Sequence, residues 1–275
     1  MILVTGATGQ LGRAVCTVRP EAIATDRTTL DLADHAVLAQ AVRSLRPSAI
    51  VNCAAFTAVD AAEAEPARAE AINAVAVGII AAEARRLGIP FLTFSTDYVF
   101  DGTAAVPYVE SSPPHPINAY GHSKLNGERV ALAECPGSLV VRSSWLFSAT
   151  HPNFVTTIVS RARLGSVRVV GDQTGSPTYA LDLAGAALEA LERGVTGVLH
   201  LTNGGSTSWF ELARTACRLA GVDEGRVTPI TTAEYPTAAQ RPRYSVLGSE
   251  RRTELGLEEL RHWTEALSAA IADPA

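Results

Sequence analysis

Tyr120 and Lys124 are the residues of this chain whose types and spacing are best suited to chemistry. They lie in the run Asn118-Ala-Tyr-Gly-His-Ser-Lys124, and a separation of four residues places both side chains on one face of a helix, about 6 Å apart along its axis. A free tyrosine, with a pKa of about 10, exchanges protons poorly near neutral pH, but a nearby ammonium group favours the phenolate and lowers that pKa. The pair could therefore act as a tyrosine acid/base, although this spacing also arises often by chance.

A glycine-rich segment, Thr5-Gly-Ala-Thr-Gly-Gln-Leu-Gly12, follows a short apolar run and opens a helical one, which is the context of a dinucleotide-binding turn. Gly6 would permit the tight turn, Gly9 the approach of a pyrophosphate to the backbone, and Gly12 the packing of the helix on the sheet. The first two glycines are one residue further apart than in G-x-G-x-x-G, and an ordinary glycine-rich turn is the alternative. The position after the first strand favours nucleotide binding. We expect cofactor contacts from Gly6, Thr8, Gly9, Gln10, Leu11 and Gly12.

Asp26 stands 20 positions after Gly6, at the end of the second expected strand. An acid there would bind the ribose 2′-hydroxyl of NAD, whereas the adjacent Arg27 could hold the 2′-phosphate of NADP. The two signals conflict, so the choice between NADH and NADPH stays open, and a solvated Asp-Arg turn would explain the same residues. Asp31 and Leu32 follow and could border the adenine.

Two strand ends carry residues suited to a cofactor and a substrate. Val51-Asn-Cys-Ala-Ala55 ends in small residues that leave room for a flat cofactor, although tight helix–sheet packing would want the same residues. Phe94-Ser-Thr-Asp-Tyr-Val-Phe100 places hydroxyl groups and an acid at the carboxyl end of a strand, where open α/β sheets bind ligands. Because Ser95 and Thr96 are adjacent, their side chains point to opposite faces, so one could hydrogen-bond a substrate carbonyl while the other faces a helix. A Ser/Thr-Asp turn that only closes the strand is the alternative.

The composition excludes several classes of protein. The 275 residues are 47% hydrophobic and 19% charged, as in a compact globule, and the net charge of -5 provides no basic surface for nucleic acid. The cysteines, at positions 16, 53, 135 and 217, form no C-x-x-C pair, and the histidines form no H-x-x-x-H pair, so no metal is expected. No run reaches the roughly 20 apolar residues that span a bilayer, and the start lacks the basic region of a signal peptide. We therefore expect no membrane partner and a cytoplasmic location.

Short continuous apolar runs alternate with alanine-rich helical stretches, which predicts βαβ units and an α/β fold with a Rossmann-type, doubly wound parallel sheet. The expected strands are Ile2–Thr5, Ala22–Thr25, Ala49–Cys53, Phe91–Ser95 and Leu139–Arg142, and the expected helices cover 10–18, 34–45, 66–87 and 121–133. Further along, the expected strands are Arg168–Val170 and Val198–Thr202, and the expected helices are Ser176–Glu192, Ser208–Ala220 and Glu258–Ala272. Because the pattern loosens near residue 148, we divide the chain into an NAD(P)-binding domain, 1–148, and a smaller α/β domain, 149–275, that binds mainly substrate and is interleaved with the first.

The order of these motifs resembles the extended short-chain dehydrogenase/reductase superfamily: T-G-x-x-G-x-x-G, an acid after the second strand, N-x-A-A, S-T-D-Y-V-F and Y-x-x-x-K. Further strings resemble, more narrowly, the dTDP-4-dehydrorhamnose reductase family. They are Ala55-Phe-Thr-Ala-Val-Asp60, Arg142-Ser-Ser-Trp-Leu-Phe147, Asp172-Gln-Thr-Gly-Ser-Pro-Thr178 and Arg241-Pro-Arg-Tyr-Ser245. The resemblance covers nearly the whole chain, from Ile2 to the final helix.

The resemblance implies NADPH or NADH as cofactor and, as substrate, a dTDP-linked 4-keto-6-deoxy sugar in deoxysugar biosynthesis. Tyr120 would protonate the forming alkoxide, Lys124 would lower the tyrosine pKa and hold the nicotinamide ribose, and Thr96 would polarise the ketone. A developing oxyanion needs such donors in place before reaction. Further cofactor contacts are implied for Ala54, Ala55, Thr57, Ser95, Tyr120 and Lys124. Substrate contacts are implied for Thr96, Asp97, Tyr98, Tyr120, Trp145, Gln173, Thr178 and Arg241, with core packing the alternative for Trp145 and a salt bridge for Arg241.

Other members of the superfamily fit the sequence less well or stay open. Nucleotide-sugar 4,6-dehydratases carry Thr-Asp-Glu, whereas this chain has Thr96-Asp97-Tyr98 and lacks that glutamate base, so net reduction is favoured. A 4-epimerase stays open, as does a non-catalytic NADP-binding subunit similar to the regulatory β-subunit of methionine adenosyltransferase. Some family members bridge a homodimer through magnesium-binding glutamates. A homodimer stays open here, but Ala14 and Leu181 stand near the positions of those acids, so a metal bridge is not favoured.

Overall fold

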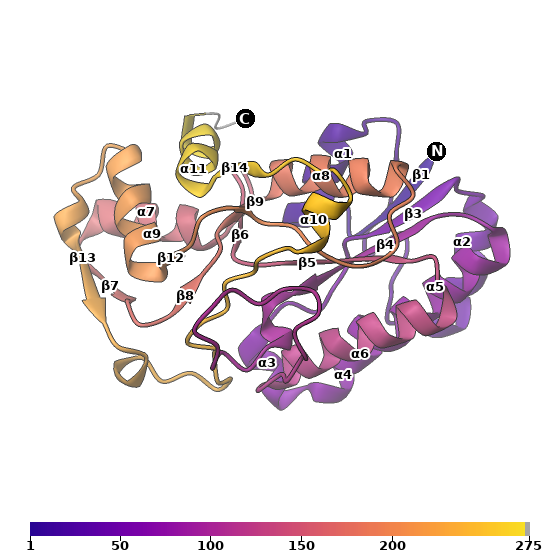
Figure 1. The fold of residues 1–275 in the computed structure, drawn as a ribbon, viewed down its shortest axis with the longest axis horizontal. Helices are drawn as coiled ribbons and strands as arrows, with labels where there is room; N and C mark the ends of the chain where they lie inside the picture. The colour runs from indigo at the N-terminus through magenta and orange to yellow at the C-terminus, as the bar shows by residue number, and fades with distance from the viewer. Residues whose placement is uncertain (273–275) are drawn as a thin grey trace.

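A six-stranded parallel sheet forms the centre of the computed structural model, which describes residues 1–272 (Figure 1). In spatial order the strands are β10 (Gly197–His200), β5 (Leu139–Ser143), β4 (Phe91–Thr96), β3 (Ala49–Asn52), β1 (Ile2–Thr5) and β2 (Ile23–Ala24). Every neighbouring pair runs parallel. β2 and β3 pair with opposite sides of β1, so the strand order changes direction at β1. Open α/β sheets bind ligands at the carboxyl ends of the strands beside such a topological switch point.

Helices cover both faces of this sheet, because alternate residues of each strand point to opposite sides. The helices are α1 (Gln10–Val18) and α8 (Ala180–Glu192) on one face, and α2 (His35–Leu45), α5 (Ala76–Leu87) and α6 (Ala119–Glu134) on the other (Figure 1). Val4 and Val51 are buried under the first set, whereas their neighbours Leu3 and Ile50 are buried under the second. This two-sided burial explains the continuous apolar runs, and it confirms the predicted doubly wound α/β fold.

Most elements beyond residue 148 lie to one side of the main sheet (Figure 1). They include α7 (Phe154–Leu164), β7 (Val167–Val170), α9 (Trp209–Leu219), β13 (Val227–Ile230) and α11 (Trp263–Ala272). Short strand pairs hold the long loops: β6 (Leu146–Phe147) with β9 (Thr178–Tyr179), β8 (Thr174–Gly175) with β12 (Thr207–Ser208), and β11 (Asn203–Gly204) with β14 (Leu260–His262). β13 pairs with β7, and two apolar clusters lie beneath α7, α9 and α11. β10 and α8 return to the main sheet, so the chain passes between the two parts more than once.

Several helices differ from their predicted bounds because tertiary contacts override the sequence pattern. The stretch 66–87, predicted as one helix, consists of α4 (Pro66–Glu70), the π-helical turn η1 (Ala71–Val75) and α5. α8 begins at Ala180, because the residues before it form β9, and α11 begins at Trp263, because β14 precedes it.

The remaining helices and 3₁₀ turns are α3 (Val59–Ala64), α10 (Arg251–Glu254), η2 (Asp97–Val99), η3 (Glu224–Arg226) and η4 (Thr232–Glu234). Within residues 1–272, no helix has the length and apolar character needed to cross a membrane.

Candidate active site

Two side chains cap the first turn of α6, the helix that carries the predicted tyrosine and lysine. Asn118 Oδ1 accepts a hydrogen bond from the Gly121 amide at 2.7 Å, and Glu63 Oε1 accepts one from the Ala119 amide at 2.8 Å. These caps satisfy amide groups that have no partner inside a helix. Asn118 also donates through Nδ2 to the Gln240 carbonyl oxygen at 2.8 Å. The start of α6 is therefore fixed from two directions, one of them in the C-terminal part of the chain.

Tyr120 is in hydrogen-bond contact with Thr96, which ends β4, so the structure brings together the two hydroxyl groups that the sequence paired. Burial raises the pKa of Tyr120 to about 12; the hydrogen bond with Thr96 lowers this pKa, and the nearby Asp97 raises it further. The sequence predicted that Lys124 would lower this pKa, and that prediction is wrong for this arrangement. Lys124 Nζ donates instead to the carbonyl oxygen of Phe94 at 2.7 Å. Tyr120 is consequently protonated at neutral pH and ready to donate a proton.

Lys124 lies under the site, with only 5% of its surface exposed. Burial lowers the pKa of this amine to about 8, and the carboxylate of Glu128, one turn further along α6, opposes that shift. Below pH 8 the amine is therefore mostly an ammonium group, held against β4 on the side of the sheet that α6 covers.

Asp97 and Tyr98 form the wall of the site next to Thr96. Asp97 Oδ1 accepts a hydrogen bond from the Thr96 hydroxyl at 3.0 Å, and Ser245 is a second side-chain partner of Asp97. Burial raises the pKa of Asp97 to about 6, and its Oδ2 is buried with no hydrogen-bond partner among the described residues. The Tyr98 ring meets the Tyr120 ring edge to face, with centroids 5.9 Å apart and planes at 77°. Because buried polar atoms are nearly always paired, Oδ2 marks a place where a ligand hydroxyl could bind.

The glycine-rich turn after β1 has a shape that side chains would block. Gly6 has a φ of +64°, and a Cβ there would lie 2.7 Å from the Ala54 backbone. A Cβ on Gly12 would lie 2.2 Å from the Gly6 carbonyl oxygen. Gly9 is the N-cap of α1 and provides no side-chain cap, so the first amide groups of Gln10 and Leu11 point out of a bare helix end. Such an end binds a phosphate group through amide donors and the helix dipole, so the turn fits the pyrophosphate of a dinucleotide.

A hollow of about 460 Å³ lies beside this turn, near the end of β2. Its polar lining includes Thr8, Arg13, Asp26 and Thr29. Asp26 Oδ1 accepts hydrogen bonds from Thr28 and Thr29, and the bonds from Thr28 are the main reason why the pKa of Asp26 is lowered. An ionised carboxylate in this hollow fits the ribose of a bound dinucleotide. Arg13 was missed by the sequence analysis; a basic residue in the first turn after the glycines was the available signal.

The other residues predicted near the adenosine, Arg27, Asp31 and Leu32, differ in their exposure to solvent. Arg27 and Asp31 are exposed, and Asp31 accepts a hydrogen bond from the Ala33 amide at 2.9 Å. Leu32 is 5% exposed and belongs to the apolar cluster under α2 and α5. Its side chain therefore packs in the core.

The segment after β3 is braced against both the glycine turn and α6. It contains the predicted cofactor contacts Ala54, Ala55 and Thr57. Asn73, in the π-helical turn η1, accepts from the Phe56 amide at 2.8 Å and donates to the Phe56 carbonyl oxygen at 3.0 Å. Asn73 also donates to the Ser123 hydroxyl at 2.9 Å, and π turns of this kind occur often at functional sites. Asn73 was missed by the sequence analysis, where a lone asparagine in an alanine-rich helical stretch was the only signal.

Trp145 follows β5 in a left-handed backbone conformation, with φ of 47°. Its ring stacks on that of Trp209, with centroids 3.6 Å apart and planes at 9°. Gly175 lies on it as well, since a Cβ there would be 2.4 Å from the Trp145 ring. A bulky residue in this conformation is strained by about 1–3 kcal/mol and persists only where its surroundings fix it. The structure therefore holds Trp145 in one orientation.

The three residues predicted to contact the nucleotide have partners within the chain. Gln173 Nε2 donates to the Thr232 hydroxyl at 3.1 Å, and Thr178 is fully buried and donates to a backbone carbonyl oxygen. Arg241 forms an ion pair with Asp60 at 2.8 Å, across 181 positions of the chain. The Arg241 ion pair fastens the C-terminal part to the first domain, whereas the bonds of Gln173 and Thr178 stay within the C-terminal part. The contact of these three side chains with a nucleotide stays a prediction.

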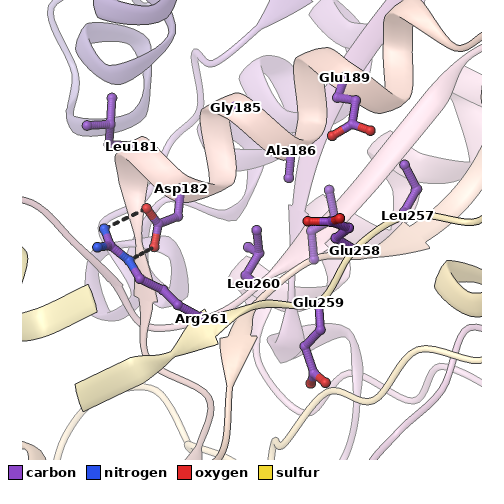
Figure 2. Close-up of a pocket in the computed structure, with 11 residues that line it drawn as sticks. Leu181, Asp182, Gly185, Ala186, Glu189, Leu257, Glu258, Glu259, Leu260 and Arg261 are labelled. Atoms are coloured by element: carbon purple, nitrogen blue, oxygen red, sulfur yellow. Dashed lines mark hydrogen bonds and ion pairs between the residues drawn. The ribbon is translucent and has the colours of Figure 1, made fainter. Parts of the chain in front are cut away.

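A second hollow, of about 310 Å³, lies between α8 and the segment 257–261 (Figure 2). Its lining is acidic, with Glu189, Glu258 and Glu259, and Asp182 forms an ion pair with Arg261 at 2.8 Å. None of the predicted site residues lines it. Residues 1–272 contain no group of three or more His, Cys, Asp or Glu side chains placed to hold a metal ion.

The sheet, its glycine-rich first turn and the Thr96, Tyr120 and Lys124 groups at the end of β4 define an extended short-chain dehydrogenase/reductase. The family model described as the RmlD substrate binding domain matches residues 1–275, and the chain belongs to this family. The dTDP-4-dehydrorhamnose reductase of Streptomyces griseus is 44% identical over 280 residues, which cover 98% of this chain and 92% of that protein. A probable dTDP-4,6-dihydroxy-2-methyloxan-3-one 4-ketoreductase of Streptomyces antibioticus is 42% identical, covering 98% and 94%.

A solved structure of the dTDP-4-dehydrorhamnose reductase of Bacillus anthracis, in complex with NADP, superposes with a TM-score of 0.95. It is 35% identical in sequence, and the match covers 98% of each chain. The predicted family, the Rossmann-type fold and the class of NAD(P)H-dependent oxidoreductase are confirmed.

Proposed function

We propose that this chain uses NADPH or NADH to reduce the 4-keto group of a dTDP-linked 4-keto-6-deoxyhexose in deoxysugar biosynthesis. The observation that carries the proposal is the contact between Thr96 and Tyr120 at the carboxyl end of β4, with Lys124 buried behind them. The Tyr120 hydroxyl, and the Thr96 hydroxyl once its proton turns from Asp97 Oδ1, can both donate to the oxygen of a ketone as negative charge develops on it. The relatives named for dTDP-4-keto sugar reduction support the substrate class.

Each residue has a defined part in this mechanism. The amides of the glycine turn bind the pyrophosphate, Asp26 binds the adenosine ribose, and Lys124 binds the second ribose. When bound, the nicotinamide supplies the hydride. Tyr120 donates its phenolic proton to the oxygen of the former ketone, and Thr96 holds that oxygen by a hydrogen bond. Asp97, Tyr98 and Trp145 line the sugar, whereas Gln173, Thr178 and Arg241 lie toward the nucleotide half.

Several further properties belong to the same proposal. We assign residues 1–148 mainly to the cofactor and 149–275 mainly to the sugar, supported by the position of the glycine turn in the first and of the predicted substrate contacts Gln173, Thr178 and Arg241 in the second. The enzyme acts in the cytoplasm on a small substrate, with no role in nucleic-acid or membrane binding. Asp26 favours NADH, while Arg13 and Arg27 beside it could accept the extra phosphate of NADPH.

The test is to mix the protein with a dTDP-4-keto-6-deoxy sugar, with and without a 3,5-epimerase, and to follow nicotinamide absorbance with each cofactor. We expect cofactor oxidation in step with loss of the ketone. A 4-epimerase would interconvert sugars without net cofactor oxidation, and a regulatory subunit would bind NADP and reduce nothing. Sedimentation of the same sample tests the homodimer. Failure to turn over either sugar epimer with either cofactor contradicts the proposed function.

A further inference from the structure

A buried ion pair lies behind the catalytic lysine, outside the set of residues assigned above. Glu128 of α6 and Arg142 of β5 are 3% and 4% exposed. Arg142 Nη2 donates to Glu128 Oε2 at 2.6 Å, and Arg142 Nε donates to Glu128 Oε1 at 2.9 Å. Removing two charges from water costs about as much as such a pair returns, so a buried pair is weak evidence for stability. Its presence therefore calls for another explanation.

The arginine of this pair is locked in place by β10 and by an aromatic ring. His200 Nδ1 faces the carbonyl oxygens of Gly248 at 2.8 Å and Tyr108 at 3.2 Å, so Nδ1 carries the proton and donates. Nε2 then accepts from Arg142 Nη1 at 3.3 Å. Burial lowers the pKa of His200, which keeps the imidazole neutral, and Arg142 also lies over the ring of Phe100 at 5.2 Å from its centroid. Arg142 can therefore hold the carboxylate in only one orientation.

The carboxylate side of the pair faces the catalytic lysine. Glu128 follows Lys124 by four residues, which places both on one face of α6. Lys124 Nζ donates to the carbonyl oxygen of Phe94, and Glu128 Oε1 accepts from the hydroxyl of the next residue, Ser95. The ammonium and the carboxylate thus meet β4 at adjacent residues, just before Thr96. Ser95, predicted as a cofactor contact, is turned away toward Glu128.

We propose that Glu128 is a positioning residue whose carboxylate, fixed by Arg142 and Ser95, holds the buried Lys124 as an ammonium group against the Phe94 carbonyl of β4. Among the described residues, Glu128 is the charged group that favours the ammonium form of Lys124, and the hydrogen-bond partner of Nζ, the carbonyl oxygen of Phe94, is uncharged. Without that carboxylate, burial opposes the charge on the amine with nothing to balance it. The inference rests on the proposed function, because it concerns the lysine of the same site.

Lys124 is the only lysine in the chain, which allows a direct measurement. Protein made with ¹³C-labelled lysine gives one lysine side-chain signal, and the shift of its Cε reports the charge on Nζ during a pH titration without substrate. We expect Glu128→Gln to lower the pKa of Lys124 by about 1–3 units, the usual effect of one close opposite charge. Glu70→Gln is the matched control. Glu70 lies in α4 and accepts hydrogen bonds at 3.1 and 3.2 Å from Asn126 of α6, the helix that carries Lys124. This substitution should leave the titration of Lys124 unchanged.

A variant that fails to fold does not end the test. Glu128→Met combined with Arg142→Met removes the carboxylate without leaving a buried charge unpaired, and such replacements are often tolerated. In this variant we again expect the pKa of Lys124 to fall, because the carboxylate is lost. The proposal is overturned if Lys124 titrates at the wild-type pH or higher in whichever folded variant lacks the carboxylate. This result is independent of turnover, so it is separable from failure of the proposed function. If the enzyme turns over substrate, the alkaline limb of the kcat–pH profile of Glu128→Gln should move to lower pH than that of the wild type. The size of this move should match the fall in the Lys124 pKa measured by NMR.

Discussion

Replacing Trp209 by leucine should release Trp145 from its strained conformation and weaken sugar binding. The two indoles stack at 3.6 Å, and such a pair contributes about 0.5–1.5 kcal/mol beyond the area it buries. The φ of 47° at Trp145 costs about 1–3 kcal/mol of backbone strain. The free energy of the indole stack, together with the packing of Gly175 on the Trp145 ring, is large enough to offset this strain. Leucine keeps an apolar side chain in the half-buried position but cannot stack. Trp145 is then free to return to an ordinary backbone conformation.

The expected result is a rise in KM for the dTDP-sugar with a small change in kcat. Loss of about 1 kcal/mol of positioning corresponds to roughly a fivefold rise in KM. A change that acts on binding equally in the ground and transition states leaves kcat nearly constant. The KM for the cofactor should not move, because the proposed function assigns Trp145 to the sugar and not to the cofactor.

Circular dichroism provides the structural readout, because two stacked indoles give a paired positive and negative band. The chain has three tryptophans, and Trp263, in the same apolar cluster as Trp145 and Trp209, makes no indole stack. Trp263→Phe is therefore the matched control and should keep the paired band. Trp209→Leu should lose it while the far-ultraviolet helical signal stays. If Trp209→Leu folds and loses the paired band but keeps the wild-type KM, then sugar binding does not depend on the indole stack. That result contradicts the prediction.

Three further substitutions test the site. Tyr120→Phe should lower kcat by about 10²–10⁴-fold, the usual contribution of a general acid, while a fluorescence titration with NADPH shows unchanged cofactor affinity; unchanged turnover would remove Tyr120 from the mechanism. The pKa of Asp97 is raised to about 6, so its contribution to stability is full below the unfolded value of about 3.9 and is lost as pH rises through about 6. Asp97→Asn should therefore raise the urea midpoint, relative to the wild type, more above neutral pH than in acid, and an equal effect at both contradicts the assignment. Asp26→Ala should raise the KM for NADH by roughly tenfold or more, the effect of one charged hydrogen bond, and should affect NADPH less; equal losses for both cofactors would place Asp26 outside the ribose site.

The sequence predicted the parts of this site that depend on local spacing. β1 has the predicted bounds, and the glycine turn follows it because Gly6 and Gly12 tolerate contacts that a Cβ would prevent. Thr96 and Tyr120 could be paired in advance because the carboxyl ends of parallel strands share one edge of the sheet, and the helix after β4 starts there. These features follow from short-range pattern and from the geometry of βαβ units.

The parts that depend on distant residues could not be predicted. The π turn at Asn73 forms where that amide binds the Phe56 backbone, and no helical period shows such a contact. A salt bridge was the stated alternative for Arg241, but the pattern could not name its partner, because Asp60 is 181 positions away and was quoted only as part of a motif. The pKa of Tyr120 depends on burial, a property of the finished fold. The lysine spacing alone therefore predicted its direction wrongly.

The raised pKa of Tyr120 also distinguishes between the two enzymatic alternatives. A reductase needs the phenol, because the alkoxide formed at the former ketone is a stronger base and takes its proton. A 4-epimerase must begin by oxidising an alcohol and needs the phenolate, the form that burial of Tyr120 disfavours. Burial thus stabilises the form of Tyr120 that reduction consumes, and Asp97 raises the pKa further. The chain needs no glutamate beside Asp97 for this chemistry, because the only proton to be moved already lies on Tyr120.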